Sequence, residues 1–376
     1  MYLTIYKSNQ ENTPKIDYND INNQIVMIDP LMYYKYTIKI DNPKPINELP
    51  RELINKINQH KQTLNQIWEI LKPFEHNYTE QYYTFKIPKR SQGLRTIHAP
   101  LPAFKTALTT AKDLFENKMK CLAHPSAYAY TKNRSTYDAL ELHQKNESNW
   151  YLKIDLTDFF ANCTPDLIFK QLMQIFPFYY LEDTEQTTLK NIIKVCCLDN
   201  GLPQGTPMSP FLTNLLMVPY DYILYNYLTR GSGEHYVYTR YADDILISSK
   251  SAFDWRELTD KLAELLKPFE IKRQKTRYGS KAGSNWNLGL MLNKDNKITL
   301  GHQKKKLLNA MLNNFLNDFS ENRLWSREDT YELQGQLSYL QHIEEEYYNY
   351  IMRKYQDKHN VNFKQAVKRI LNPHNY

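Results

Sequence analysis

The chain of 376 residues contains 41% hydrophobic and 13% aromatic residues. This composition supplies apolar side chains for a sizeable core of two or three subdomains and excludes a mostly disordered protein. The formal net charge is +7, and between Lys267 and Lys306 eleven Lys and Arg residues face only two acids. A polyanionic partner is the direct interpretation of this segment, and a solvated surface broken by loops is the alternative.

The sequence predicts a cytoplasmic protein that does not enter a membrane. Residues 1–7 lack the basic and apolar regions of a signal peptide, and no run approaches about 18 apolar residues. The four cysteines lack metal-ligand spacing, so we expect small buried thiols in a reducing compartment. They are Cys121, Cys163, Cys196 and Cys197.

The N-terminal part of the chain combines helical patterns with one hairpin. Apolar residues between Pro50 and Phe74 recur at near-helical spacing and predict a helix that serves packing. Residues 83–100 read as strand, polar turn and strand, and segments 103–121 and 135–145 read as helices. The hairpin can hold a triphosphate through charge-assisted hydrogen bonds, or its charges can keep an exposed hairpin soluble. It has four cations and no acid: Lys86, Lys89, Arg90 and Arg95.

Two stretches in the middle of the chain place polar residues beside apolar elements. A strand over 150–155 ends on Asp155, and a helix is predicted to open at Thr164-Pro165. An aspartate at the end of a buried strand either caps a helix or binds a ligand. The loop 200–210 has Gly and Pro on both sides of Gln204 and precedes an apolar helix over 211–227. Such a loop lets backbone approach a ligand closely, although an ordinary turn is the alternative.

The stretch Tyr241-Ala242-Asp243-Asp244 lies between two apolar runs and predicts a β-hairpin with two carboxylates at its tip. Carboxylates placed between apolar strands repel each other and lose hydration unless a cation compensates them. A hard divalent ion such as Mg²⁺ is the natural compensator. The alternative is an Asp-Asp turn that only ends two strands.

The remaining chain is predicted to contain a helix over 251–267, a basic strand over 271–276 and a hairpin over 286–300. The tail from His302 to Tyr376 reads as helical throughout, with three consecutive lysines near its start. No repeat or low-complexity linker interrupts the sequence, so we expect one compact body with several lobes.

Taken in order, these stretches resemble reverse transcriptases of the bacterial group that contains retron, group II intron and defence-associated enzymes. The resemblance spans roughly residues 80–300 and rests on Asp155 after a strand, Leu-Pro-Gln-Gly-X-X-X-Ser-Pro at 202–210, Tyr-Ala-Asp-Asp at 241–244 and Leu-Gly at 288–289. It implies an α+β right-hand polymerase fold. The implied divisions are an N-terminal helical extension (1–80), fingers (81–150), a palm (151–300) with an antiparallel sheet backed by helices, and a helical thumb (301–376).

The resemblance also implies roles for individual residues in RNA-directed DNA synthesis. Two-metal phosphoryl transfer needs carboxylates from separate strands, and Asp155, Asp243 and Asp244 would hold two Mg²⁺ ions, which Mn²⁺ can replace. Lys89, Arg95, Phe160 and Gln204 would contact the incoming deoxynucleotide, with the Phe160 ring excluding a 2′-OH, while Phe159 is the core member of that pair. Contacts to the nucleic acid would come from Tyr241, Lys275, Gly289, Lys304, Lys305 and Lys306.

The partners implied are an RNA template and a DNA product, with a dedicated non-coding RNA, antiphage defence, an effector protein or a homo-oligomer as further expectations. Retron enzymes usually carry Asn-Ala-X-X-His and Val-Thr-Gly motifs, which residues 138–143 and 287–289 do not match. This difference favours an orphan defence relative. Two alternatives stay open: a template-independent or protein-primed DNA polymerase, and a non-catalytic RNA-binding protein.

Overall fold

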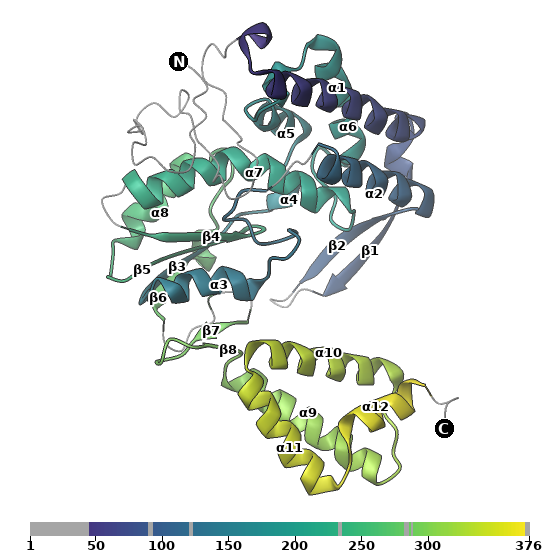
Figure 1. The fold of residues 1–376 in the computed structure, drawn as a ribbon, viewed down its shortest axis with the longest axis vertical. Coiled ribbons are helices and arrows are strands. Elements are labelled where there is room, and N and C mark those ends of the chain that lie inside the picture. The colour runs from purple at the N-terminus through teal and green to yellow at the C-terminus, as the bar shows by residue number, and fades with distance from the viewer. Residues whose placement is uncertain are drawn as a thin grey trace. The chain divides into compact units, whose positions relative to one another are not determined.

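The computed structural model describes residues 45–88, 93–119, 123–231, 235–281, 286 and 289–372. Lys89, Cys121 and Leu288 therefore lie outside the described residues. The described chain forms two compact units, which are shown as ribbons in Figure 1. The first unit holds the described residues up to Arg134 together with Leu152–Ser249 and Phe253–Tyr278, and the second holds Ser135–Tyr151, Lys250–Ala252 and the residues from Gly279 onward.

The first unit is built around a long apolar helix, α7 (Met208–Asn226), in which nearly every side chain is buried. A helix that is apolar all round is stable only when other elements cover it on all sides. Helices α2, α5 and α8 contact α7, and the sheet lies below it in Figure 1. The other helices of this unit are α1 (Arg51–Leu71), α2 (Pro102–Asn117), α4 (Phe159–Asn162), α5 (Pro165–Leu172), α6 (Asp183–Cys196) and α8 (Trp255–Leu265).

The main sheet has the strand order β4-β5-β3-β6. Strands β4 (Val237–Tyr241) and β5 (Asp244–Ser249) pair antiparallel and end in the register Tyr241↔Asp244. The other two strands are β3 (Trp150–Asp155) and β6 (Arg277–Ser280). A separate antiparallel hairpin consists of β1 (Tyr82–Pro88) and β2 (Leu94–Pro100). Helices and antiparallel strands together confirm the predicted α+β class.

The second unit is mainly helical. Helix α3 (Thr136–Lys145) opens with a capping box between Ser135 and Asp138, and it contacts β8 (Ile298–Thr299), which pairs with β7 (Met291–Leu292). The tail is helical as predicted. It folds into α9 (His302–Ser320), α10 (Arg327–Ile343), α11 (Glu345–His359) and α12 (Phe363–Leu371). None of the described helices combines the length and the apolar composition that crossing a bilayer requires.

Two predicted helix starts and one predicted strand differ from the structure. The helix expected from Phe211 begins at Met208, three residues earlier. The helix expected from Ser251 begins at Trp255, because the Asp254 carboxylate caps it by accepting hydrogen bonds from the backbone N–H groups of Arg256 and Glu257. The predicted basic strand over 271–276 is wrong.

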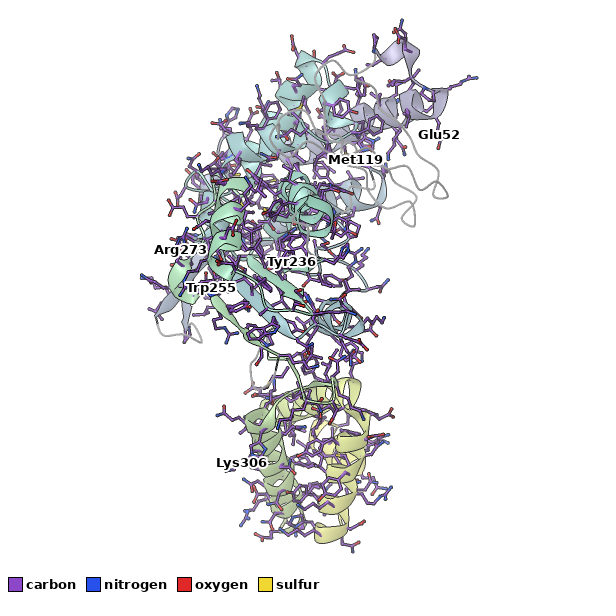
Figure 2. All side chains as sticks on the ribbon, turned by 90° about the vertical axis from the view of Figure 1, so that its left-hand side faces the viewer. Glu52, Met119, Tyr236, Trp255, Arg273 and Lys306 are labelled. Atoms are coloured by element: carbon purple, nitrogen blue, oxygen red, sulfur yellow. The ribbon has the colours of Figure 1, made fainter. Side chains whose placement is uncertain are left out.

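That segment forms a 3₁₀ turn at Arg273–Lys275, and β6 starts only at Arg277. Its run of charged residues has no apolar alternation that could supply a buried strand face. The turn lies against α8, where Arg273 pairs with Asp260 at 2.5 Å (Figure 2).

Candidate active site

The carboxylate-bearing end of β3 and the β4–β5 turn lie side by side. Asp155 is the last residue of β3, and β5 is the neighbour of β3 in the sheet. The backbone N–H of Leu156 donates to the Asp243 carbonyl at 3.4 Å. Ala242 takes a left-handed conformation, with φ of 58°, to make the turn between Tyr241 and Asp244. Asp155 therefore lies close to Asp243 and Asp244, although it is far from them in the sequence.

The charge environment of Asp243 is unfavourable for an ionised carboxylate. Burial is the largest cause that raises the pKa of Asp243, and the negative charges of Asp244 and Asp155 raise it further. A backbone hydrogen bond and the cation of Lys275 act in the opposite direction. The net result is a raised pKa, so the folded chain holds a partly desolvated carboxylate between two like charges.

Two lysines neutralise the other two aspartates. Lys153 Nζ lies 2.9 Å from Asp244 Oδ2, and Lys275 Nζ lies 2.7 Å from Asp155 Oδ2. The hydrogen bond to Asp155 raises the pKa of Lys275. Asp243 forms no ion pair with any residue that the structure describes. Within the same residues, no three His, Cys, Asp or Glu side chains are arranged as a metal-ligand cluster.

A fully buried ion pair is hydrogen-bonded to the turn that carries Asp243 and Asp244. Arg240 and Asp221 have no exposed side-chain surface, and Arg240 Nη2 lies 2.7 Å from Asp221 Oδ2. Arg240 Nε and the Tyr238 hydroxyl both donate to Asp221 Oδ1, at 2.7 and 2.6 Å. Arg240 Nη1 also donates to the Ala242 carbonyl at 3.0 Å and to Asn214 Oδ1 at 3.3 Å. The guanidinium thereby connects α7 to the turn that carries Asp243.

This pair was not predicted from the sequence, although the sequence contains a signal for it. Asp221 is the single acid in the apolar run 211–227, and Arg240 is a charge within an aromatic and β-branched strand. Charges in otherwise apolar elements are almost always paired when they are buried.

The loop 200–210 lies between α4 and β2. Leu202 N–H donates to the Phe160 carbonyl at 2.9 Å, and a Cβ on Gly201 would lie only 2.5 Å from the Ala161 carbonyl oxygen. On the other side, His98 N–H donates to the Gln204 carbonyl at 2.8 Å. The side-chain Oε1 of Gln204 is buried without a hydrogen-bond partner among the described residues. The loop thus leaves an unused acceptor near Phe160.

The two adjacent phenylalanines have different environments. Phe159 is 3% exposed and packs against Phe269, as expected for a core residue. Phe160 is half-buried on the same short helix, with its ring edge-on to that of Phe159. Its backbone supports the Gln204 loop.

The other predicted site residues divide between the two units. Arg95 is exposed on β2, and Tyr241 is half-buried at the end of β4. Gly289 has a φ of 101°, a conformation that glycine adopts without strain. The lysines at 304–306 begin α9 in the second unit, where Lys304 and the labelled Lys306 are exposed (Figure 2).

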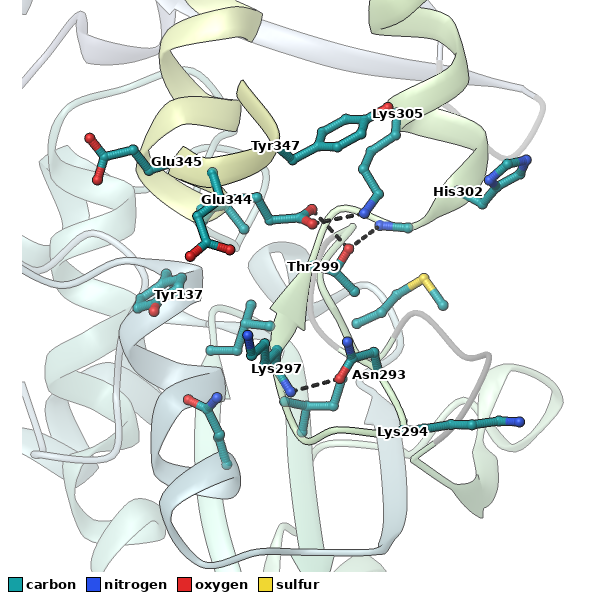
Figure 3. Close-up of a pocket in the computed structure, with 17 residues that line it drawn as sticks. Tyr137, Asn293, Lys294, Lys297, Thr299, His302, Lys305, Glu344, Glu345 and Tyr347 are labelled. Carbon is teal, nitrogen blue, oxygen red and sulfur yellow. Dashed lines mark hydrogen bonds and ion pairs between the residues drawn. The ribbon is translucent and has the colours of Figure 1, made fainter. Parts of the chain in front are cut away.

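Lys305 lines a pocket of about 680 Å³ in the second unit (Figure 3), where it forms an ion pair with Glu344. Glu344, at the junction of α10 and α11, accepts from Lys305 Nζ at 2.7 Å. The same carboxylate accepts from Thr299 Oγ1 at 2.8 Å and from Leu300 N–H at 2.9 Å. This carboxylate ties the start of α9 to the α10–α11 junction, and none of the three aspartates lines the pocket.

Comparison with known proteins gives consistent results. The family described as reverse transcriptase (RNA-dependent DNA polymerase) matches residues 87–292. The retron Ec83 reverse transcriptase of Escherichia coli is 30% identical over 289 residues, which cover 73% of this chain and 86% of that protein. The retron Ec73 reverse transcriptase of the same species is 31% identical over 303 residues, covering 77% and 89%. A solved structure of apo telomerase from Candida tropicalis aligns with a TM-score of 0.42 at 15% identity, covering 78% of this chain and 64% of that one.

The motif differences at 138–143 and 287–289 led us to expect an orphan relative, and the matched relatives are retron enzymes instead. The chain belongs to the reverse transcriptase family and is an RNA-directed DNA polymerase of the bacterial retron type.

Proposed function

We propose that Asp155, Asp243 and Asp244 form the catalytic centre and hold two Mg²⁺ ions, or Mn²⁺ in their place. The observation that carries this proposal is that Asp155, at the end of β3, lies beside the Asp243-Asp244 turn, where Asp243 is partly desolvated and its pKa is raised. Oxygen ligands with excess negative charge suit a hard divalent cation. When bound, such ions compensate the charge that develops on the attacking and leaving oxygens in phosphoryl transfer.

The lysines at this edge fit the same proposal. Lys153 and Lys275 pair with Asp244 and Asp155, and these cations offset the repulsion between the carboxylates. Lys275 is 48% exposed, so its ammonium group can turn from Asp155 toward a phosphate. Its pKa is raised, so it remains a cation at neutral pH.

The incoming deoxynucleoside triphosphate is proposed to lie between the β1–β2 hairpin and the loop 200–210. Arg95 supplies an exposed guanidinium for its phosphates, and Lys89 is proposed for the same role from the sequence motif. The unpartnered Oε1 of Gln204 is an acceptor with no other use in the described structure. The half-buried ring of Phe160 would exclude a 2′-OH and so select deoxynucleotides.

The remaining roles concern the nucleic acid. Tyr241 adjoins the aspartate turn and is proposed to contact the primer end, with Gly289 as a further primer contact. Of the three lysines on α9, Lys304 and Lys306 are proposed to bind phosphates of the template–primer duplex, because Glu344 neutralises Lys305. Residues 81–150, 151–300 and 301–376 are proposed as fingers, palm and thumb, after a helical extension over 1–80.

We also propose that the template is a dedicated non-coding RNA and that the enzyme serves antiphage defence with an effector protein or as a homo-oligomer in the cytoplasm. The support is the similarity over most of the chain to enzymes named as retron reverse transcriptases. Extension by the purified protein with and without its co-purifying RNA tests the first part. Products of the same sequence after RNA removal would contradict a dedicated template.

The catalytic proposal is tested by the double variant Asp243→Asn with Asp244→Asn. We expect DNA synthesis to be abolished while RNA binding, measured by filter retention, persists. Asp260→Asn is the control, because Asp260 is an exposed acid paired with Arg273 at the surface, and it should extend normally. Normal primer extension by the double variant would refute the assignment.

A further inference from the structure

Residues 126–131 lie beside β4, the strand that leads into the turn carrying Asp243 and Asp244. Arg240 N–H donates to the Ser126 carbonyl at 2.7 Å, and Tyr128 N–H donates to the Arg240 carbonyl at 2.8 Å. The two segments form a parallel bridge at Ala127 and Arg240. The bridge places the start of this segment beside the end of β4, and Asp243 and Tyr241 both act electrostatically on Tyr130.

The same buried ion pair that supports the turn also anchors this segment. Asn214 Nδ2 donates to the Ala129 carbonyl at 2.8 Å, while its Oδ1 accepts from Arg240. Arg240 in turn donates to the Ala242 carbonyl. The residue before Tyr130 and the residue before Asp243 are therefore held by one network, which fixes the two side chains relative to each other.

Tyr130 itself has a costly backbone conformation and an exposed ring. Its φ is 58°, in the left-handed region that bulky residues rarely adopt. The residue is 52% exposed, and no described residue forms a hydrogen bond with its hydroxyl. Strained backbone at a non-glycine residue that buries little apolar surface is typical of a functional position rather than a packing position.

The electrostatic surroundings of the hydroxyl agree with this placement. Partial burial is the largest cause that raises the pKa of Tyr130, the charges of Asp243 and Tyr241 add to it, and Arg95 opposes it. The hydroxyl therefore stays protonated and can donate at neutral pH. Its electrostatic neighbours are a proposed catalytic carboxylate, a proposed primer contact and a proposed phosphate contact.

We propose that Tyr130 is a nucleotide-binding residue whose hydroxyl donates to the triphosphate of the incoming deoxynucleotide beside Arg95. An anion held by Arg95 provides the acceptor that the described protein lacks at this point. This inference rests on the proposed function, because it requires a nucleotide at the aspartate turn.

Two variants separate the hydroxyl from the ring. Tyr130→Phe removes only the hydroxyl, and Tyr130→Asn removes the ring while keeping a residue that tolerates the left-handed conformation. The control is Tyr331→Phe, since Tyr331 is 54% exposed on α10. The full-length protein is assayed on an RNA template with a DNA primer, with KM for the dNTP, kcat and the thermal midpoint measured. Retention of a dNTP on a chain-terminated primer gives binding without turnover.

We expect Tyr130→Phe to raise the KM for the dNTP about ten-fold, as for loss of a hydrogen bond to a charged group. Because this contact forms before the chemical step, kcat should stay within about two-fold. Tyr130→Asn should raise KM at least as much, dNTP retention should fall in parallel, and the thermal midpoint should not fall.

Three results would overturn the inference. If the wild type is active and both variants have the same KM and dNTP retention as the wild type, Tyr130 does not belong to the nucleotide site, and the proposed function stands. A rise in KM for the primer alone, with dNTP binding unchanged, assigns the residue to the primer. A wild type that neither retains a dNTP nor extends a primer would overturn the proposed function, and this inference with it.

Discussion

Replacing Asp221 with alanine is expected to destabilise the first unit and loosen the aspartate turn together. The substitution removes a carboxylate that accepts three hydrogen bonds of 2.6–2.7 Å and leaves the Arg240 cation fully buried without a counter-charge. Breaking a buried pair from one side costs about 3–5 kcal/mol. For a unit of this size, each kcal/mol lowers the thermal midpoint by about 2–4 °C, so the expected fall is roughly 6–20 °C.

The assay compares the thermal midpoint, followed by circular dichroism, with primer extension at a temperature where the variant remains folded. Asp260→Ala is the control, because it also removes the acid of an Arg–Asp ion pair, but both side chains of that pair are more than 60% exposed. Exposed pairs contribute about 0–1 kcal/mol, so this control should melt within a few degrees of the wild type.

The double variant Asp221→Leu with Arg240→Met separates the loss of stability from the loss of turn positioning. Replacing a buried ion pair by apolar residues of similar volume is often neutral, so it should recover much of the midpoint lost in Asp221→Ala. Extension should remain impaired, because no guanidinium would then hold the Ala242 carbonyl. An Asp221→Ala protein as stable as the wild type would refute the energetic argument, and a fully active double variant would refute the positioning of the turn.

Three further predictions test other parts of the site. Phe160→Ala should admit ribonucleotides, measured as the ratio of kcat/KM for dNTP over rNTP, and unchanged discrimination would count against the steric role of the ring. Gly201→Ala should lower the free energy of unfolding by about 1–3 kcal/mol, because it forces a Cβ against the Ala161 backbone. Gly335→Ala has open space in α10 and should raise the free energy of unfolding by about 0.5–1 kcal/mol. Equal denaturation midpoints for the two variants would contradict this prediction. The pKa of Asp243 in the folded chain is raised above its ordinary value of 3.8. Ionisation of Asp243 therefore destabilises the folded state relative to the unfolded state above that raised pKa, and has no such effect below pH 3.8. Asp243→Asn should therefore stabilise the metal-free protein at about pH 7–8 but not near about pH 3, and a pH-independent shift in midpoint would argue against this linkage.

Local pattern was sufficient for the elements that carry the main motifs. Alternating residues on both sides of a polar turn predicted the 83–100 hairpin, and two apolar runs around Asp243-Asp244 predicted β4, β5 and their turn. Pattern failed at 271–276, where a run of charges resembles a strand in composition but has no face to bury. It also placed the start of α7 three residues late, because Met208 to Pro210 read as loop punctuation.

The sequence by itself determined the family, the order of its motifs and the position of Asp155 at the end of a strand, because these depend on residue type and short-range periodicity. Only the tertiary structure decided that Lys153 and Lys275 neutralise Asp244 and Asp155, partners 91 and 120 residues away. It alone also showed the buried Arg240–Asp221 pair beneath the turn and the strained Tyr130 beside it. Such contacts depend on which strands become neighbours in a sheet, and side-chain pairing across a fold leaves no periodic trace in the chain.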